Sequence, residues 1–268
     1  MEALFEALSM PFLQRALVAG VLVAILAGYY GVFVVQRGLS FMGTGLAHAA
    51  FGGVALGILL GVEPLWTAAP FTIFAALGMA WVRERTEVSS DTAVGIIFAV
   101  SMALGIVFLA LKGEYSSEAF GYLFGSILAV NRADIVLALA MLALSVLALP
   151  LWGRWAYATF DRELARVDRL PVARHDYLLS VFIAASVVVA VKVLGAVLIA
   201  AYLVIPAATA RTVSRSFLTM TLLSVAFGVL CTLVGLVLSY VLDFPSGATI
   251  ILLQAALFFA LMPFSRLR

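Results

Sequence analysis

Long apolar runs alternate with short polar clusters along the whole chain. A helix needs about 20 mainly apolar residues to cross the hydrocarbon core of a bilayer. The pattern therefore predicts an all-α fold, a polytopic membrane helical bundle of about eight or nine transmembrane helices. The apolar runs cover residues 16–35, 43–62, 65–82, 92–111, 132–152, 178–210, 217–242 and 247–264.

The run at 178–210 leaves the number of passes open. It is too long for one straight span of ordinary length. It forms either one long broken helix or two shorter helices that turn near Lys192–Gly195. The first alternative gives eight passes and the second gives nine.

The composition agrees with a lipid environment. The chain is 65% hydrophobic and 11% charged, whereas an ordinary soluble domain is about half apolar and about a quarter charged. The leading segment MEALFEALSMPFLQR holds two glutamates and one arginine, unlike the basic start of a signal peptide. We expect this segment to lie on the membrane surface ahead of a retained first helix.

The distribution of basic residues predicts the orientation, because cytoplasmic loops of membrane proteins are enriched in lysine and arginine. With the amino terminus outside and nine passes, four basic residues fall outside: Arg15, Lys112, Arg132 and Lys192. The others fall on the cytoplasmic side: Arg37, Arg83, Arg85, Arg154, Arg162, Arg166, Arg169, Arg174, Arg211, Arg215, Arg266 and Arg268.

His48 is the candidate for chemistry inside the membrane. It lies in the stretch FMGTGLAHAAFGGVALGILLG, residues 41–61, and ionisable side chains deep in a span are functional candidates by default. Neutral imidazole suits zinc, copper, iron and nickel. The competing interpretation is a structural histidine that donates to a carbonyl of a neighbouring helix.

Several function classes lack their sequence motifs. The chain has neither the phosphate-binding pattern G-x-x-x-x-G-K-[ST] nor the hydrolytic patterns H-E-x-x-H and G-x-S-x-G. A basic run with interleaved aromatic residues, typical of nucleic-acid binding, is also missing. The middles of the spans hold almost no acidic residues, which disfavours an ion-driven carrier acting without ATPase subunits. That carrier remains the alternative from another class.

Five stretches resemble, in order and spacing, the permease subunits of bacterial metal-ion ABC importers of the zinc/manganese/iron class. They are GTGLAHAAFGGVALGILLG, DTAVGIIFAVSMALGIVFL, GYLFGSILAV, VKVLGAVLIAAYLVIPAATAR and DFPSGATIILLQAALFF. The resemblance covers about residues 10 to 262. It implies that residues 1–268 form a single transmembrane permease domain in the bacterial cytoplasmic (inner) membrane.

The resemblance also implies the partners. The chain would pair with a second copy of itself, two cytoplasmic ATPase subunits would bind ATP, and an external metal-binding protein would deliver the ion. The chain would then be a transport subunit rather than an enzyme, with a transported divalent metal as its cargo. Zinc is the favoured ion, and manganese or iron is the alternative.

The resemblance carries over to two positions in the second span. Relatives usually read G-D-x-L-x-H, and this chain keeps His48 but has Thr44 in place of the aspartate. Residues four apart share one face of a helix, and the resemblance implies that this face lines the path of the metal. With Thr44, either the ion is held more loosely or the missing ligand comes from elsewhere, such as the second copy.

Residues 158–172 would form the loop that couples the permease to its ATPase. Within it, a short helix would carry the coupling residues Asp161, Glu163, Leu164, Ala165 and Arg166. Relatives commonly have a glycine soon after that alanine, where this chain has Asp168 and Arg169. The plainer interpretation is a solvated loop that obeys the charge bias of cytoplasmic segments.

The motif DFPSG near the carboxyl end would lie on the external face. Asp243, Pro245 and Gly247 would belong to an outer gate or to the docking surface for the metal-delivery protein. The plainer interpretation is a rigid turn between two helices.

Overall fold

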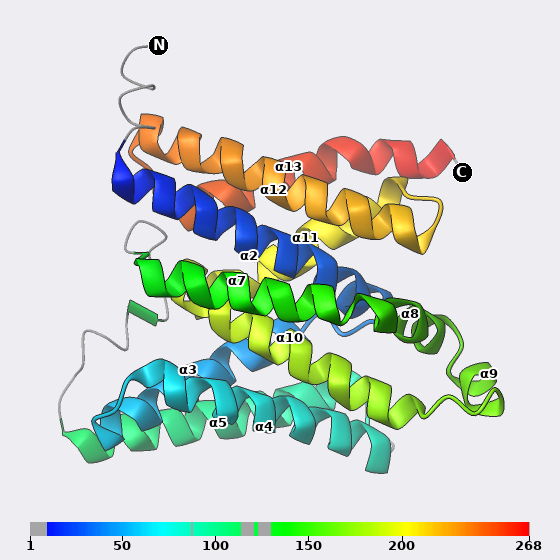
Figure 1. Cartoon of the computed structure of the whole chain (residues 1–268), viewed down its shortest axis with the longest axis horizontal. Helices are drawn as coiled ribbons and strands as arrows, with labels where there is room; N and C mark the ends of the chain where they lie inside the picture. The colour runs from blue at the N-terminus through cyan, green and yellow to red at the C-terminus, as the bar shows by residue number, and fades with distance from the viewer. Residues whose placement is uncertain (1–9, 87, 114–120, 123–129, 268) are drawn as a thin grey trace.

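The computed structural model describes residues 10–86, 88–113, 121–122 and 130–267, with backbone alone for 265–267. The helices lie side by side along one axis (Figure 1). The first half comprises α2 (Pro11–Gln36), α3 (Met42–Leu60), α4 (Pro64–Arg85), α5 (Ser90–Lys112) and α7 (Arg132–Leu147). The second half comprises η2 (Leu149–Leu151), α8 (Trp152–Phe160), α9 (Arg162–Val167), α10 (Val172–Leu194), α11 (Ala196–Val213), α12 (Phe217–Leu242), α13 (Ser246–Leu261) and η3 (Met262–Leu267).

The predicted fold class is confirmed. In the described part of the chain, eight helices are long and apolar enough to cross a membrane. A bent pair, α7 followed by η2 and α8, makes a ninth candidate span. The apolar run at 178–210 is two helices, since α10 ends at Leu194 and α11 starts at Ala196. Gly195 between them has φ of 84°, a conformation that favours glycine.

Two boundaries differ from the predictions. The run at 132–152 is not one straight helix, because the chain bends by 46° between α7 and the segment Leu149–Phe160. Pro150 lies in this bend. Proline has no N–H to donate, and in a straight helix its ring would clash with the preceding turn. The first span begins at Pro11 rather than at residue 16, so Arg15 belongs to it. Of the predicted surface segment, residues 1–9 lie outside the described residues.

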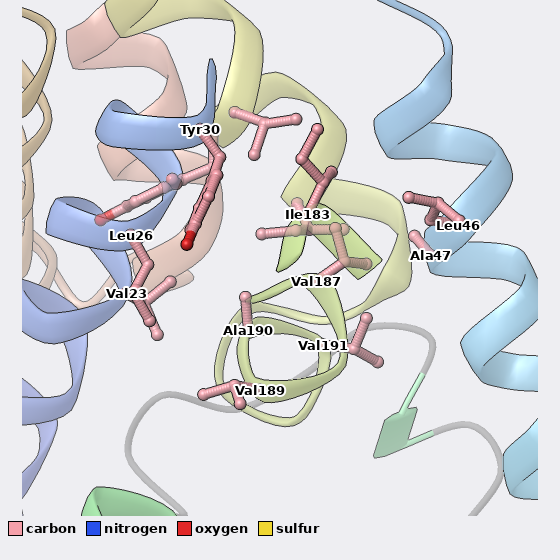
Figure 2. Close-up of a cluster of buried hydrophobic side chains, with 14 of the residues drawn as sticks. Val23, Leu26, Tyr30, Leu46, Ala47, Ile183, Val187, Val189, Ala190 and Val191 are labelled. Carbon is pink, nitrogen blue, oxygen red and sulfur yellow. The ribbon is translucent and has the colours of Figure 1, made fainter. Parts of the chain in front are cut away.

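The core lies where α2, α3 and α10 meet (Figure 2). Figure 2 shows Leu26 of α2, Leu46 of α3 and Val187 of α10 among its buried side chains. Tyr30 is also buried, and its hydroxyl lies 2.8 Å from the Ser145 hydroxyl of α7. By contrast, α5 and α13 have 17% of their most apolar windows buried. These two helices therefore present most of their apolar surface to lipid or to another subunit.

Small residues allow α2 and α11 to pack closely. A Cβ added at Gly31 would lie 2.1 Å from the backbone oxygen of Leu203, so the two helices would have to move apart. Overpacking of this kind costs about 1–3 kcal/mol. We expect Gly31→Ala to lower the midpoint of thermal unfolding in detergent. Gly153→Ala in α8 is the control, because no heavy atom lies within 4 Å of its added Cβ. Equal midpoints for the two variants would contradict the close packing.

Candidate functional site

His48 lies on the partly uncovered stripe of α3. It is the seventh residue of that helix, about 9 Å from the helix start at 1.5 Å per residue. Most of α3 is buried, but His48 is half-buried together with Thr44, Leu56 and Leu59. Their spacing of three, four or eight residues places them on one side of the helix. His48 and Thr44 therefore share a face, as the sequence predicts, and this face has access to the outside of the single chain.

The His48 ring is oriented by its own helix. Nδ1 lies 2.9 Å from the Thr44 carbonyl oxygen, and the ring meets Phe98 of α5 edge to face at 4.8 Å between centroids. A carbonyl oxygen can only accept, so Nδ1 carries the proton and donates. In the neutral ring Nε2 then has a free lone pair. Metal-binding histidines are commonly held in this way, by a hydrogen bond from the other ring nitrogen to a carbonyl.

The structural interpretation of His48 is corrected in one respect. It predicted a hydrogen bond to a neighbouring helix, but the carbonyl belongs to Thr44, one turn earlier in α3. The imidazole therefore does not link two helices through this bond. Within the described residues, no three His, Cys, Asp or Glu side chains gather in a cluster that could hold a metal ion.

A second candidate region lies at the end of the bundle where α8 leads into α9 (Figure 1). The predicted short helix is present as α9, and Asp161 caps it by accepting from the backbone N–H of Leu164 at 2.8 Å. Ala165 is fully buried against Ala158 and Val172. Leu164 is 49% exposed on the same short helix. One side of α9 is thus fixed to the bundle while an apolar side chain remains available to a partner.

The other coupling candidates of α9 are exposed. Glu163 and Arg166 form a loose ion pair at 3.9 Å, which contributes little at a solvated surface. Beyond the helix, Arg169 has φ of 60°. That left-handed conformation costs a residue with a side chain about 1–2 kcal/mol relative to glycine. Arg169 therefore stands in a backbone conformation that favours glycine.

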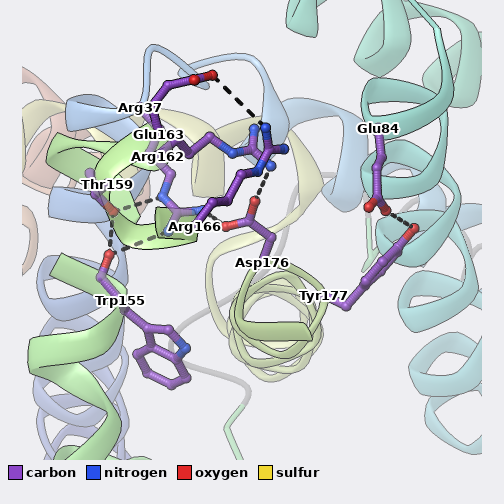
Figure 3. Close-up of polar contacts among 9 residues, drawn as sticks. All are labelled: Arg37, Glu84, Trp155, Thr159, Arg162, Glu163, Arg166, Asp176 and Tyr177. Carbon is purple, nitrogen blue, oxygen red and sulfur yellow. Dashed lines mark hydrogen bonds and ion pairs between the residues drawn. The ribbon is translucent and has the colours of Figure 1, made fainter. Parts of the chain in front are cut away.

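An ion cluster missed by the sequence predictions lies beside α9 (Figure 3). Asp176 of α10 accepts from Arg37 at 2.6 Å through one carboxylate oxygen and from Arg162 of α9 through the other. The Arg37 side chain also donates to the Thr159 hydroxyl at 2.8 Å and to the Trp155 carbonyl at 3.4 Å. Burial lowers the pKa of Arg37, and attraction to Asp176 opposes that shift. The cluster joins the end of α2 to α8, α9 and α10.

A separate ion pair lies at the other end of α10. Lys192 Nζ is 2.7 Å from a carboxylate oxygen of Asp134. Asp134 also forms a capping box with Asn131 at the start of α7. The pair joins the last turn of α10 to the first turn of α7, at the end predicted to face outside. The sequence places Lys192 near a turn but does not predict that it meets Asp134.

The DFPSG motif forms a tight turn between α12 and α13. Asp243 ends α12 with φ of 55°, and the Ser239 hydroxyl donates to the Phe244 carbonyl at 2.6 Å. Pro245 immediately precedes α13. A Cβ on Gly247 would lie 2.3 Å from Leu198 Cδ1, so Gly247 allows α13 to approach α11. Asp243 and Pro245 are exposed on this turn.

Comparisons with known proteins agree with this architecture. Residues 9–265 match the ABC 3 transport family. The manganese transport system membrane protein MntC of Listeria innocua is 34% identical, over 92% of this chain and 89% of its own. A Haemophilus influenzae protein named "Probable iron transport system membrane protein" is 33% identical, over 99% of this chain and 98% of its own.

A solved structure matches as well. The structure of PsaBC from Streptococcus pneumoniae in complex with Fab superposes with a TM-score of 0.86 at 34% identity, covering 97% of this chain and 95% of the matched one. These matches confirm the resemblance to membrane-spanning subunits of bacterial metal-ion ABC importers and the location in the inner membrane. The chain belongs to the ABC 3 transport family.

Proposed function

We propose that two copies of this chain form the path of a divalent transition-metal ion through an ATP-driven importer. His48 carries this proposal. Its oriented ring leaves Nε2 free on the half-buried stripe of α3, where it can bind an ion without a full ligand set. A high-affinity zinc site takes about four ligands, whereas a transported ion must also leave. His48 is therefore a transient ligand, with Thr44 beside it.

The coupling and docking roles complete the proposal. Residues 158–172 contact a separate ATPase subunit, through Asp161, Glu163, Leu164, Ala165 and Arg166. An external metal-binding protein delivers the ion near Asp243, Pro245 and Gly247. The exposed Leu164 and the exposed outer turn support these roles. Residues 1–268 act as one permease domain.

Manganese is the favoured cargo. The similar proteins are named for manganese and iron transport. The Thr44 hydroxyl is an oxygen donor, and manganese prefers oxygen ligands, whereas soft sulfur ligands favour zinc. Zinc remains the rival cargo, because the neutral imidazole of His48 suits zinc.

Competition for uptake distinguishes these ions. The chain is reconstituted in liposomes with its ATPase and its metal-binding protein, and radioactive Mn²⁺ uptake is measured with excess unlabelled Mn²⁺, Fe²⁺ or Zn²⁺. We expect ATP-dependent Mn²⁺ uptake that excess unlabelled Mn²⁺ suppresses more strongly than the same excess of Fe²⁺ or Zn²⁺. Stronger suppression by Zn²⁺ than by Mn²⁺ would overturn the manganese assignment in favour of zinc.

A further inference from the structure

We infer that Asp176 transmits the movement of the coupling helix α9 to α2 and α10, as a positioning residue for transport. This inference rests on the proposed function, in which α9 contacts the ATPase. Asp176 contacts Arg162 of α9 with one carboxylate oxygen and Arg37 with the other. A single carboxylate thus connects the helix nearest the ATPase to the ends of two spans.

The three charged side chains, Asp176, Arg37 and Arg162, differ in how far they are buried, and this difference indicates their roles. The side chains of Asp176 and Arg37 are each 10% exposed, whereas that of Arg162 is 41% exposed. Asp176 is too enclosed to serve as a contact surface for a partner protein. Asp176 lies between Arg162 and Arg37, so a displacement of Arg162 acts on Asp176 before it reaches Arg37.

Arg37 spreads the connection further. Three groups of its guanidinium donate to Asp176, Thr159 and the Trp155 carbonyl. A guanidinium is planar and rigid, and its donors hold a fixed geometry. Movement of Asp176 therefore displaces the end of α2 and the last turns of α8 together. The path from α9 into the spans thus includes a chain of charged hydrogen bonds, beside the apolar contact of Ala165 with Ala158 and Val172.

The position of Asp176 in α10 extends the path across the membrane. Asp176 lies in the second turn of α10, and Lys192 lies in its last turn, where it pairs with Asp134 of α7. Between these two ion pairs the helix is continuous and most of its residues are buried. A continuous α-helix is hydrogen-bonded along its whole length, so a shift of one end is passed along its axis. Displacement at its inner end therefore reaches the outer end of α7.

The test compares metal uptake with ATP hydrolysis in the reconstituted importer, using Mn²⁺. Asp176→Asn weakens both ion pairs, and Arg162→Gln removes the link to α9 while leaving Arg37 and Asp176 paired. We expect each variant to transport about tenfold fewer ions per ATP hydrolysed, a loss within the range seen for coupling residues. The double variant should lose no more than the stronger single variant, because both changes interrupt the same link.

Glu84→Gln is the matched control. Glu84 also joins a span to α10 at this end, by accepting from the Tyr177 hydroxyl at 2.8 Å, but an amide oxygen can accept that bond equally well. We expect its ratio of ions to ATP to equal the wild type. The amount of ATPase that copurifies with Asp176→Asn should equal the wild-type amount, since the Asp176 side chain is only 10% exposed.

The outcomes separate this inference from the proposed function. Unchanged ratios in Asp176→Asn and Arg162→Gln, in an importer that transports Mn²⁺, would overturn the inference alone. Loss in Arg162→Gln without loss in Asp176→Asn would show that Arg162 acts directly on the ATPase, and would also overturn it. A wild-type complex that transports no metal would overturn the proposed function and the inference together. Where Asp176→Asn lowers the yield of folded protein, an unchanged ratio in Arg162→Gln alone still overturns the inference.

Discussion

His48→Ala is expected to reduce ATP-dependent metal uptake about 100-fold. Mutating even a residue that only hydrogen-bonds to a metal ligand lowers metal affinity or activity by up to about 100-fold. The imidazole is held by its bond from Nδ1 to the Thr44 carbonyl and by Phe98. Alanine removes the Nε2 lone pair and leaves α3 otherwise intact, because the half-buried ring contributes little packing to the core. Initial rates of Mn²⁺ uptake in proteoliposomes measure the loss.

Leu56→Ala provides the matched control for His48. Leu56 is half-buried on the same stripe of α3, so its truncation also alters that surface, but it offers no ligand. We expect Leu56→Ala to keep most of the uptake. Normal uptake by His48→Ala, in a complex that still hydrolyses ATP and unfolds at the wild-type temperature, would return His48 to a structural role.

Arg37→Gln is expected to lower the free energy of unfolding by about 3 kcal/mol, the cost of removing one partner of a buried ion pair. Glutamine cannot donate to Asp176, Thr159 and Trp155 together. Asp176 would keep Arg162, which is more exposed and therefore a weaker partner. Thermal unfolding in detergent, followed by the loss of helical circular dichroism, measures the effect.

Arg154→Gln is the corresponding control, because Arg154 is exposed on α8 near the same end of the bundle. A surface change of this kind usually alters stability by less than about 0.5 kcal/mol. Equal unfolding temperatures for Arg37→Gln and Arg154→Gln would contradict the importance assigned to the buried cluster.

Most of the fold is predictable from the sequence. A bilayer demands long apolar helices with their backbone groups paired internally, so hydropathy alone locates the spans. The bends are less visible. Gly195 divides a continuous apolar run into α10 and α11, and Pro150 interrupts a run that otherwise suits one straight helix. Both effects depend on local backbone geometry, which the average hydropathy of a run does not record.

The candidate site was predictable where one residue stands out from its surroundings. His48 is an imidazole in an apolar stretch, and Asp161 precedes a short polar helix that it caps. The cluster around Asp176 had no such signal. Arg37 and Asp176 are 139 residues apart, and each looks like an ordinary charge at the end of a span. The signal that could have indicated them is that the charges flank spans predicted to end on the same side of the membrane.

The most direct measurement is metal entry into liposomes that contain this chain with and without its ATPase subunit. If the chain is an importer permease, uptake should require both the ATPase subunit and ATP, because the chain lacks a phosphate-binding motif of its own. Under that account, liposomes holding the permease alone remain empty of metal. Steady Mn²⁺ entry without the ATPase subunit, driven by an ion gradient, would contradict the account and support an ion-driven carrier.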